Sequence, residues 1–145
     1  MPNVRSILKD KPRSVHTVAA NATVHDAACL MNERHIGSLV VLDRDQIAGI
    51  LTERDILTRV VAASRDPDET LVREVMTDEI LTCTPGTRLS EARHVMREKR
   101  IRHLPVIDQG RLVGMLSIGD LNLAENHELE QTIHHMEVLL TGNVF

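Results

Sequence analysis

Two stretches of the sequence, GILTERD ending at Asp55 and GMLSIGD ending at Asp120, place the same residue types at the same spacing. In each, a hydroxyl residue (Thr52 or Ser117) follows apolar residues typical of a strand and stands where a helix N-cap is expected. The unpaired N–H groups and positive dipole end of such a helix favour phosphate oxygens. An ionised carboxylate in the first helical turn only accepts hydrogen bonds, so it suits the two hydroxyls of a ribose. These residues could therefore bind a nucleotide.

The same spacing also has a purely structural explanation. A hydroxyl residue followed three positions later by an acidic residue is the pattern of a capping box, in which both side chains satisfy backbone N–H groups. Capping alone gives no reason for Gly49 and Gly114, or for the repetition of the whole context. Both interpretations stay open, and one aspartate can cap a helix and bind a ribose.

The two stretches belong to an internal duplication. Shifting the sequence by 65 positions aligns eleven identical residues without a gap. The identical pairs are Thr17 and Thr82, Ala27 and Ala92, Met31 and Met96, Glu33 and Glu98, Ile36 and Ile101, Leu39 and Leu104, Val41 and Val106, Asp43 and Asp108, Gly49 and Gly114, Leu51 and Leu116, and Asp55 and Asp120. A single copy of about 60 residues would leave apolar surface uncovered, so we expect the two copies to pack on each other.

The sequence pattern of each copy predicts the same order of elements: a strand, a helix, two strands and a second helix. The expected strands are Val15–Ala19, Ser38–Asp43 and Gln46–Leu51 in the first copy, and Ile80–Thr84, Leu104–Asp108 and Arg111–Leu116 in the second. The first helix of each copy has a buried stripe, expected at Val24, Ala27, Ala28 and Met31 and at Leu89, Ala92 and Met96. Arg44-Asp45 and Gln109-Gly110 predict tight hairpin turns. The fold class is therefore α/β, with two βαββα repeats and a C-terminal helix.

The expected division of the chain follows the duplication. The first repeat with a helical lead-in, Val4–Leu8, takes residues 1–64, and a polar linker with Pro67 takes 65–71. The second repeat takes 72–124 and starts with a similar lead-in, Val72–Met76.

Residues 125–145 are expected to form a separate C-terminal helix and tail. Leu129, Ile133, Met136 and Leu140 lie along one side of this helix, which is expected to end at Gly142. This apolar side either packs on the body of the protein or contacts another subunit.

Composition excludes several classes of function. The 145 residues carry a net charge of -4 and no Trp or Tyr, so neither a basic surface nor stacking side chains for nucleic acid are expected. No apolar segment reaches the length of about 20 residues that is needed to cross a bilayer. Cys29 and Cys83 lack CxxC spacing, and this favours a cytoplasmic protein whose thiols are reduced. The eight histidines lack metal-binding spacing, and no nucleophile motif is present. We therefore expect no metal, no catalytic residues and no catalytic cofactor.

The sequence resembles tandem CBS domains, the pair known as a Bateman module. The likeness runs from about Val4 to Leu123 and is most specific in MNERHIGSLVVLD, MREKRIRHLPVID and the two stretches quoted first. It implies a stand-alone bacterial CBS pair whose repeats pack about a pseudo-twofold axis and bind AMP, ADP, ATP, NAD or S-adenosylmethionine in clefts between them. It also implies a non-enzymatic sensor, a homodimer, and a downstream protein partner of unknown identity. The alternative is a structural dimerisation module without a physiological ligand.

The two copies differ where the phosphates of a ligand would need positive charge. The second copy has Arg102 and His103 where the first has Gly37 and Ser38, and the resemblance implies a phosphate site at this pair. We therefore favour the site of Asp120 over that of Asp55, although Arg102 and His103 could also form a solvated strand edge. The candidate ligand-binding residues are Asp120, Ser117, Arg102, His103, Gly119 and Ile118 in the second copy, Asp55, Thr52 and Arg54 in the first, the possible adenine walls Ile36, Ile101 and Pro105, and backbone groups near Val18 and Cys83. The apolar residues among them could equally be core.

Overall fold

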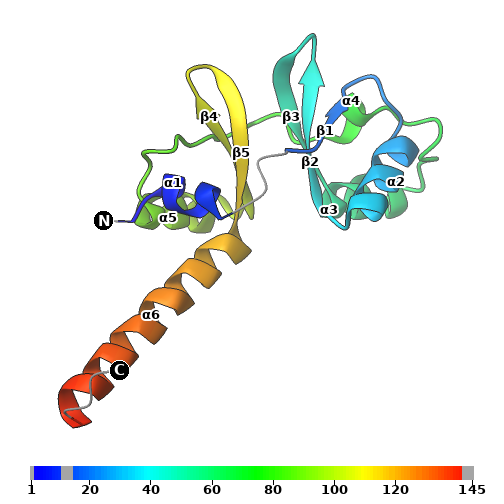
Figure 1. Ribbon diagram of the computed structural model, residues 1–145. Coiled ribbons are helices and arrows are strands. Elements are labelled where there is room, and N and C mark those ends of the chain that lie inside the picture. The colour runs from blue at the N-terminus through cyan, green and yellow to red at the C-terminus, as the bar shows by residue number, and fades with distance from the viewer. Residues whose placement is uncertain (1, 11–14, 142–145) are drawn as a thin grey trace. The chain divides into compact units, whose positions relative to one another are not determined.

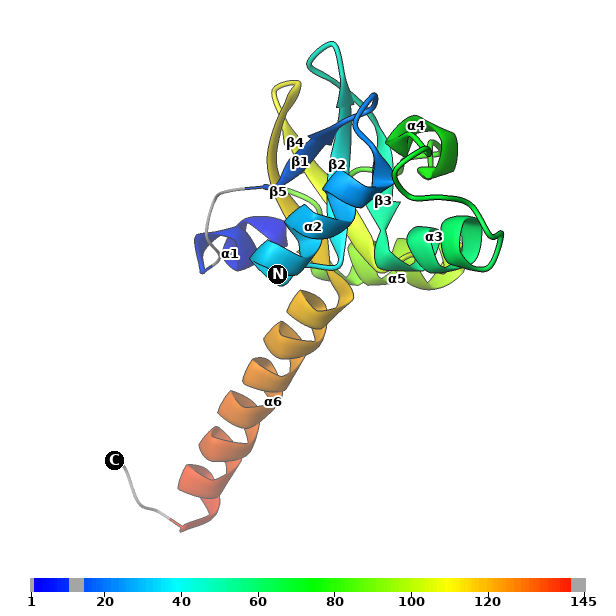
Figure 2. The same cartoon turned by 90° about the vertical axis from the view of Figure 1, so that its right-hand side faces the viewer.

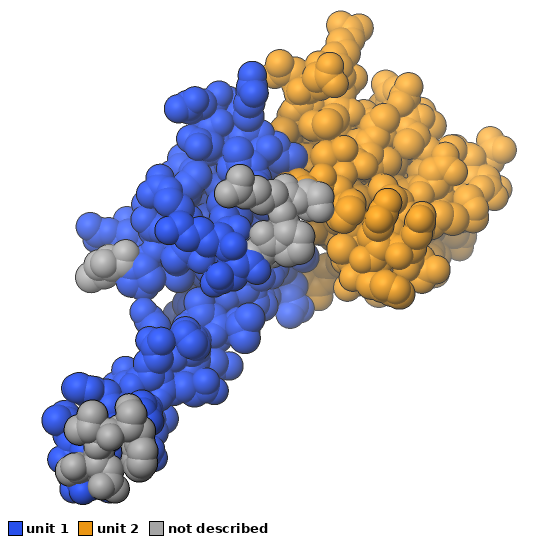
Figure 3. All heavy atoms as spheres, in the orientation of Figure 1, with its two compact units in different colours: residues 1–13, 83–145 blue, residues 14–82 orange. Residues whose placement is uncertain are grey.

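The computed structural model describes residues 2–10 and 15–141 (Figure 1). The chain forms two compact units, which Figure 3 colours separately. One unit contains residues 14–82, and the other contains residues 1–13 together with 83–145. Each unit holds one copy of the repeat and its own cluster of buried apolar side chains.

The unit of residues 14–82 is built on a three-stranded sheet. β1 (Thr17–Ala19) lies parallel to β2 (Ser38–Asp43), which pairs antiparallel with β3 (Gln46–Thr52). The helix α2 (Val24–Arg34) connects β1 and β2 and begins after Thr23, whose hydroxyl accepts a hydrogen bond from the backbone of Asp26 at 3.1 Å. A βαββ order confirms the sequence prediction for this copy.

The first helix of each repeat buries the stripe expected from the sequence except Ala28 and Leu89, which are half-buried. In α2 the buried residues are Val24, Ala27 and Met31, and in α5 (Leu89–Lys99) they are Ala92 and Met96. Both helices end at a residue in the left-handed region, His35 with φ 54° and Arg100 with φ 53°. This backbone conformation stops a helix and turns the chain toward the next strand.

The second unit contains the hairpin of β4 (His103–Asp108) and β5 (Arg111–Ser117). The prediction of a strand over Ile80–Thr84 is wrong. Of these five residues, Cys83 alone forms a β-bridge, which is isolated and parallel and pairs it with Val106. Cys83 donates to the carbonyl of Pro105 at 3.0 Å and accepts from the amide of Ile107 at 2.8 Å.

Two prolines explain why this strand is absent. In the first repeat, the amide of Val40 donates to His16 and the amide of Ala20 donates to Leu42. The residues in register in the second repeat are Pro105 and Pro85, which have no N–H to donate. The parallel ladder therefore cannot continue on either side of Cys83.

The hairpin turns agree with the sequence prediction. Arg44 and Asp45 have φ values of 51° and 63°, and Gln109 and Gly110 have 51° and 76°. Two consecutive positive φ values are typical of the tight turn whose twist matches that of the flanking strands.

Each motif is followed by a helix, but the two helices differ in length. In the first repeat α3 (Glu53–Ile56) passes directly into the π-helical segment η1 (Leu57–Val61). In the second repeat α6 (Ile118–Thr141) runs for 24 residues without a break. A separate helix starting at Glu125 is therefore wrong, because no Gly or Pro separates it from the motif, and its expected end at Gly142 lies outside the described residues.

The helical lead-ins pack on the opposite repeat from the one that follows them in the chain. α1 (Val4–Lys9) belongs to the unit of the second repeat, where the amide of Val4 donates to Thr87 at 2.9 Å. α4 (Val72–Val75) belongs to the unit of the first repeat, where the amide of Val72 donates to Ala22 at 2.8 Å. The expected boundaries after residues 64, 71 and 124 stay a prediction.

These lead-ins explain the repeated glycine of the two motifs. A Cβ on Gly49 would lie 2.7 Å from the sulfur of Met76 and from the carbonyl oxygen of Thr77. A Cβ on Gly114 would lie 2.5 Å from a methyl group of Leu8. At Gly49 the backbone oxygen of Thr77 leaves no space for a side chain, whereas at Gly114 a Cβ would displace the end of the Leu8 side chain. Packing thus offers a reason for the repeated glycine that capping does not.

Candidate functional site

Thr52 and Asp55 form a complete capping box at the start of α3. The Thr52 hydroxyl accepts from the backbone N–H of Asp55 at 3.1 Å, and Asp55 Oδ2 accepts from the backbone N–H of Thr52 at 3.0 Å. The structural explanation of the spacing is therefore correct for this copy.

Asp55 has further protein partners. The Thr77 hydroxyl donates to Asp55 Oδ1 at 3.2 Å, and Arg59 Nε lies 3.9 Å from the same oxygen. The residue is only 7% exposed. Internal donors thus contact both carboxylate oxygens, and burial limits the access of a ligand to their remaining acceptor sites.

Ser117 and Asp120 repeat the same cap at the start of α6. The backbone N–H of Ser117 donates to Asp120 Oδ2 at 2.8 Å, and that of Asp120 donates to the Ser117 hydroxyl at 3.1 Å. Asp120 is half-buried, whereas Asp55 is buried. The lead-in of this repeat carries the exposed Lys9 at the position after Leu8, where the other lead-in has Thr77 after Met76.

The hairpin of the second unit brings the candidate phosphate residues to this cap. His103 is paired with Ser117 across the two strands, and the amide of Ile118 donates to the carbonyl of Arg102 at 2.9 Å. Arg102 is exposed and His103 is half-buried. The first unit has the same backbone arrangement with Ser38 opposite Thr52, but it lacks the two basic side chains.

Gly119 and Arg54 occupy equivalent positions on the two helices. The heavy atom nearest to a Cβ on Gly119 would be the Ser117 hydroxyl, 3.6 Å away, so packing within the protein does not require this glycine. Arg54 is exposed on α3. The second motif is thus open at the position where the first presents a long basic side chain.

The remaining candidates lie on the cores. Ile36 and Val18 pack against the core of the first unit, and Ile101 and Ile118 pack against that of the second. Pro105 is buried within β4, opposite Met115.

Cys83 is 6% exposed, and both its backbone N–H and its carbonyl already bond to β4. Burial raises the pKa of the Cys83 thiol from 9.0 to about 11. Its side chain is therefore an uncharged member of the core.

The candidates thus fall into two groups, one in each unit. Arg102, His103, Ser117, Ile118, Gly119 and Asp120 come together in the second unit, with Ile101, Pro105 and Cys83 on the neighbouring strand and loop. Thr52, Arg54, Asp55, Ile36 and Val18 lie in the first unit.

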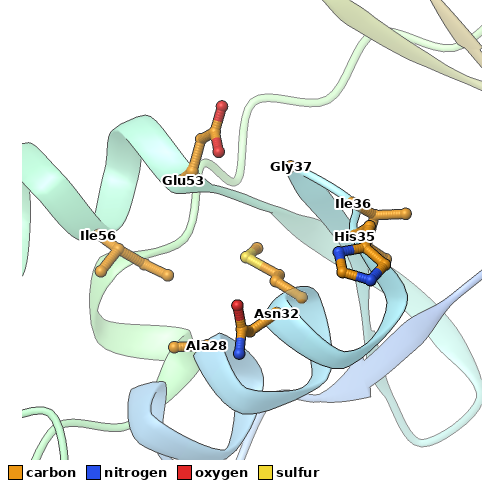
Figure 4. A pocket seen from close by; sticks show the side chains of 8 residues that line it. Ala28, Asn32, His35, Ile36, Gly37, Glu53 and Ile56 are labelled. Atoms are coloured by element: carbon orange, nitrogen blue, oxygen red, sulfur yellow. The ribbon is translucent and has the colours of Figure 1, made fainter.

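The first unit also contains an open groove that is not among the sites expected from the sequence. Its volume is about 560 Å³, and Figure 4 shows it between α2, the turn before β2, and the start of α3. The lining residues are Ala28, Met31, Asn32, His35, Ile36, Gly37, Glu53 and Ile56. A signal existed in the sequence, since Ala28, Asn32 and His35 form a second row at helical spacing beside the core stripe.

The second repeat has a large basic side chain at one of the groove positions. Arg93 occupies the position of Ala28, and its guanidinium bonds to Asn122 Oδ1 at 3.1 Å and to Glu125 Oε2 at 3.0 Å. These contacts hold α5 against the first turns of α6. The first repeat has the small Ala28 at this position, and Ala28 lines the groove.

The CBS domain profile matches this chain twice, over residues 4–62 and 72–126. The chain belongs to the CBS-domain family. A solved structure from Burkholderia ambifaria, of a protein with CBS domains and a suggested role in signal transduction, is 45% identical, covers 85% of this chain and 93% of its own, and superposes with a TM-score of 0.82.

Two curated relatives extend this comparison. The CBS domain-containing protein YhcV of Bacillus subtilis is 40% identical over 107 residues, which are 74% of this chain and 76% of the relative. The mitochondrial CBS domain-containing protein CBSX3 of Arabidopsis thaliana is 33% identical over 148 aligned positions, covering 96% of this chain and 72% of the relative. The resemblance drawn from the sequence is thus confirmed: the chain is a tandem CBS pair.

The described residues offer neither a metal site nor a membrane-spanning helix. Within residues 2–10 and 15–141, no three His, Cys, Asp or Glu side chains gather in a way that could hold a metal ion. No helix in this part of the chain combines the length and apolar character needed to cross a membrane.

Proposed function

We propose that this CBS pair is a regulatory module without catalytic activity that binds an adenine nucleotide, such as AMP, ADP, ATP or NAD, chiefly through its second repeat. Asp120 would accept hydrogen bonds from the ribose hydroxyls. Arg102, His103 and the N-terminal end of α6 would face the phosphates. Ligand binding would favour one arrangement of the two repeats and so change the surface seen by a downstream protein.

The contrast between the two aspartates carries this proposal. Asp55 is 7% exposed and is held by Thr52, Thr77 and Arg59. Asp120 keeps the cap but is half-buried. A half-buried carboxylate keeps surface that a ribose can reach, whereas a buried one must first be uncovered.

The surroundings of Asp120 suit a phosphorylated ligand. Arg102 is exposed at the same end of the hairpin, and its guanidinium can contact two phosphate oxygens at once. The helix that begins there has 24 residues, so its dipole is fully developed. Gly119 leaves space next to the first turn for the backbone to approach a ligand.

The family supports the regulatory part of the proposal. The Burkholderia relative, 45% identical, is described in terms of signal transduction. We extend a role in signal transduction to this chain, as a non-enzymatic sensor that acts as a homodimer in the cytoplasm.

Thermal unfolding with a panel of AMP, ADP, ATP, NAD and S-adenosylmethionine tests the proposal. A compound at about 100 times its Kd should stabilise the protein by about 2.7 kcal/mol, which raises the Tm by several degrees. GMP and free ribose serve as controls for the base and the phosphate. Each variant is compared with its own ligand-free Tm, because Asp55→Ala also removes internal hydrogen bonds.

The expected result is that Asp120→Ala abolishes the ligand-induced shift and Asp55→Ala only weakens it. Arg102→Ala should reduce the shift for AMP and ATP more than for adenosine. Equal loss from the two aspartate variants would overturn the preference for the second repeat.

A structural dimerisation module is the second candidate, and the internal hydrogen bonds of Asp55 favour it for the first repeat. A protein that forms a stable dimer in light scattering and shows no shift with any compound of the panel would fit this function. Nucleotide binding would then be excluded for both repeats.

A further inference from the structure

The outer part of α6 carries a row of exposed apolar side chains. Leu129, Ile133, Met136 and Leu140 are 55%, 55%, 56% and 84% exposed. We call these four residues the α6 seam. Both ribbon views show this part of the helix extending beyond the other elements of its own unit (Figures 1 and 2). The expectation that this side packs on the body is therefore not met within its unit.

The spacing of the α6 seam indicates the shape of its partner. Steps of four, three and four residues along the helix correspond to the core positions of a heptad repeat. A narrow apolar row at this spacing is the pattern through which two helices interlock side by side in a coiled coil. On a surface that stays exposed within its unit, the partner that fits this spacing best is an α-helix with apolar residues at the same spacing.

Charge decides which kind of helix fits. Residues 125–141 contain four glutamates and no lysine or arginine. Glu130 and Glu137 follow directly on Leu129 and Met136, at the positions that flank a heptad seam and set the choice of partner. In the described chain neither forms an ion pair, whereas Glu125 is bonded to Arg93 at 3.0 Å.

A second copy of α6 is a poor match for these charges. In a parallel pair Glu130 would face Glu125 of the second copy, and in an antiparallel pair it would face Glu137. Like charges at flanking positions oppose pairing in both orientations. A helix with lysine or arginine at those positions would instead form ion pairs with Glu130 and Glu137.

We propose that the α6 seam is the docking surface for an amphipathic helix of another protein, with an apolar heptad stripe flanked by lysine or arginine. This goes beyond nucleotide binding, because it needs no ligand in the CBS repeats. Leu139, which is 70% exposed beside Leu140, widens the apolar surface toward the end of the helix.

Two synthetic peptides of about three heptads test the proposal on the full chain. They share one leucine and isoleucine stripe and differ only in carrying lysine or glutamate at the flanking positions. In fluorescence anisotropy the lysine peptide should bind at least about tenfold more tightly than the glutamate peptide at about 0.1 M salt. The difference should shrink at about 1 M salt, where the screening length falls to about 3 Å.

A matched pair of variants locates the contact. Ile133→Asp places a carboxylate in the α6 seam and should abolish binding of the lysine peptide. His134→Asp places the same charge one residue along, outside the seam, and should leave binding unchanged. Circular dichroism shows whether both variants keep the helix.

A photo-crosslinker at position 136 in producing cells then tests the natural partner. The mapped segment should combine an apolar heptad stripe with flanking lysine or arginine. Equal binding of the two peptides, no loss with Ile133→Asp, or crosslinking to an acidic segment would overturn the proposal. Crosslinking of α6 to itself, with dissociation of an oligomer by Ile133→Asp, would assign the seam to a second copy instead.

Discussion

At the scale of single side chains, Asp55 and Asp120 hold the same position in the repeated motif but have different surroundings. The sequence predicts a cap at Thr52 and Ser117, and both caps are present. It could not predict that Thr77 would donate to Asp55, because these residues are 22 positions apart. A hydrogen bond between distant positions depends on how α4 packs, and no local pattern encodes this packing.

The Thr77 hydrogen bond should be measurable in stability. Thr77→Val removes the donor to a buried carboxylate, so we expect a loss of about 1–3 kcal/mol in the free energy of unfolding. Thr58→Val is the control, since the Thr58 hydroxyl bonds only to an exposed carbonyl of its own helix. Urea denaturation measures both, and an equal small effect of the two variants would contradict the role assigned to Thr77.

Because of the buried Cys83 thiol, we expect the free energy of unfolding to depend on pH in the alkaline range. Burial raises the pKa of its thiol from 9.0 to about 11. Between these values the thiol ionises in the unfolded chain but stays protonated in the folded one, so the unfolded chain binds fewer protons and stability falls as pH rises. The wild type should lose more stability between pH 9 and pH 11 than Cys83→Ala does. Parallel pH profiles of the two proteins would rule out this effect.

At the scale of elements, the duplication correctly predicts the helices and hairpins that the two copies share. The prediction is wrong where one copy has residues that the other lacks. Hydrophobic periodicity places α2, α5 and both hairpins correctly. The strand at Ile80–Thr84 was expected by analogy with Val15–Ala19, but Pro85 and Pro105 remove the donors that pair it. The continuous α6 could not be predicted from the first repeat either, because the corresponding helical segment of that repeat ends at Val61.

Restoring one donor should extend the strand in one direction. Pro105→Val reproduces Val40 of the first repeat, whose amide bonds to His16 at 3.2 Å. The new amide should donate to Leu81, so hydrogen exchange at position 105 should be slow and residues 80–82 should become more ordered. Pro85 still blocks the other side, so no protection should appear beyond Cys83. Fast exchange at position 105 would show that the prolines are not the cause.

At the scale of the whole molecule, each unit takes its lead-in from a distant part of the chain. The sequence suggested that Val4–Leu8 accompanies the first repeat because it precedes it. The structure assigns α1 to the unit of residues 83–145 and α4 to that of residues 14–82. Adjacency in sequence could not predict this exchange. Gly49 and Gly114 were its only local sign, because each must leave space for a side chain of a lead-in.

The exchange predicts which unit a mutation will weaken. Val4 and Val72 occupy equivalent positions of α1 and α4, and both side chains are fully buried. Replacing either by alanine removes two methyl groups from a core, which costs roughly 2 kcal/mol. Val4→Ala should therefore accelerate hydrogen exchange in β4, β5 and α5 while leaving β2 and β3 unchanged, although Val4 lies at the start of the chain.

Val72→Ala provides the reciprocal control. It should accelerate exchange in α2, β2 and β3 and leave β4 and β5 unchanged, because α4 packs against β3. Hydrogen exchange read by mass spectrometry resolves the two units in one experiment. If Val4→Ala loosened the first repeat instead, α1 would belong to the unit that follows it in the chain, and the explanation of Gly114 through Leu8 would have to be abandoned.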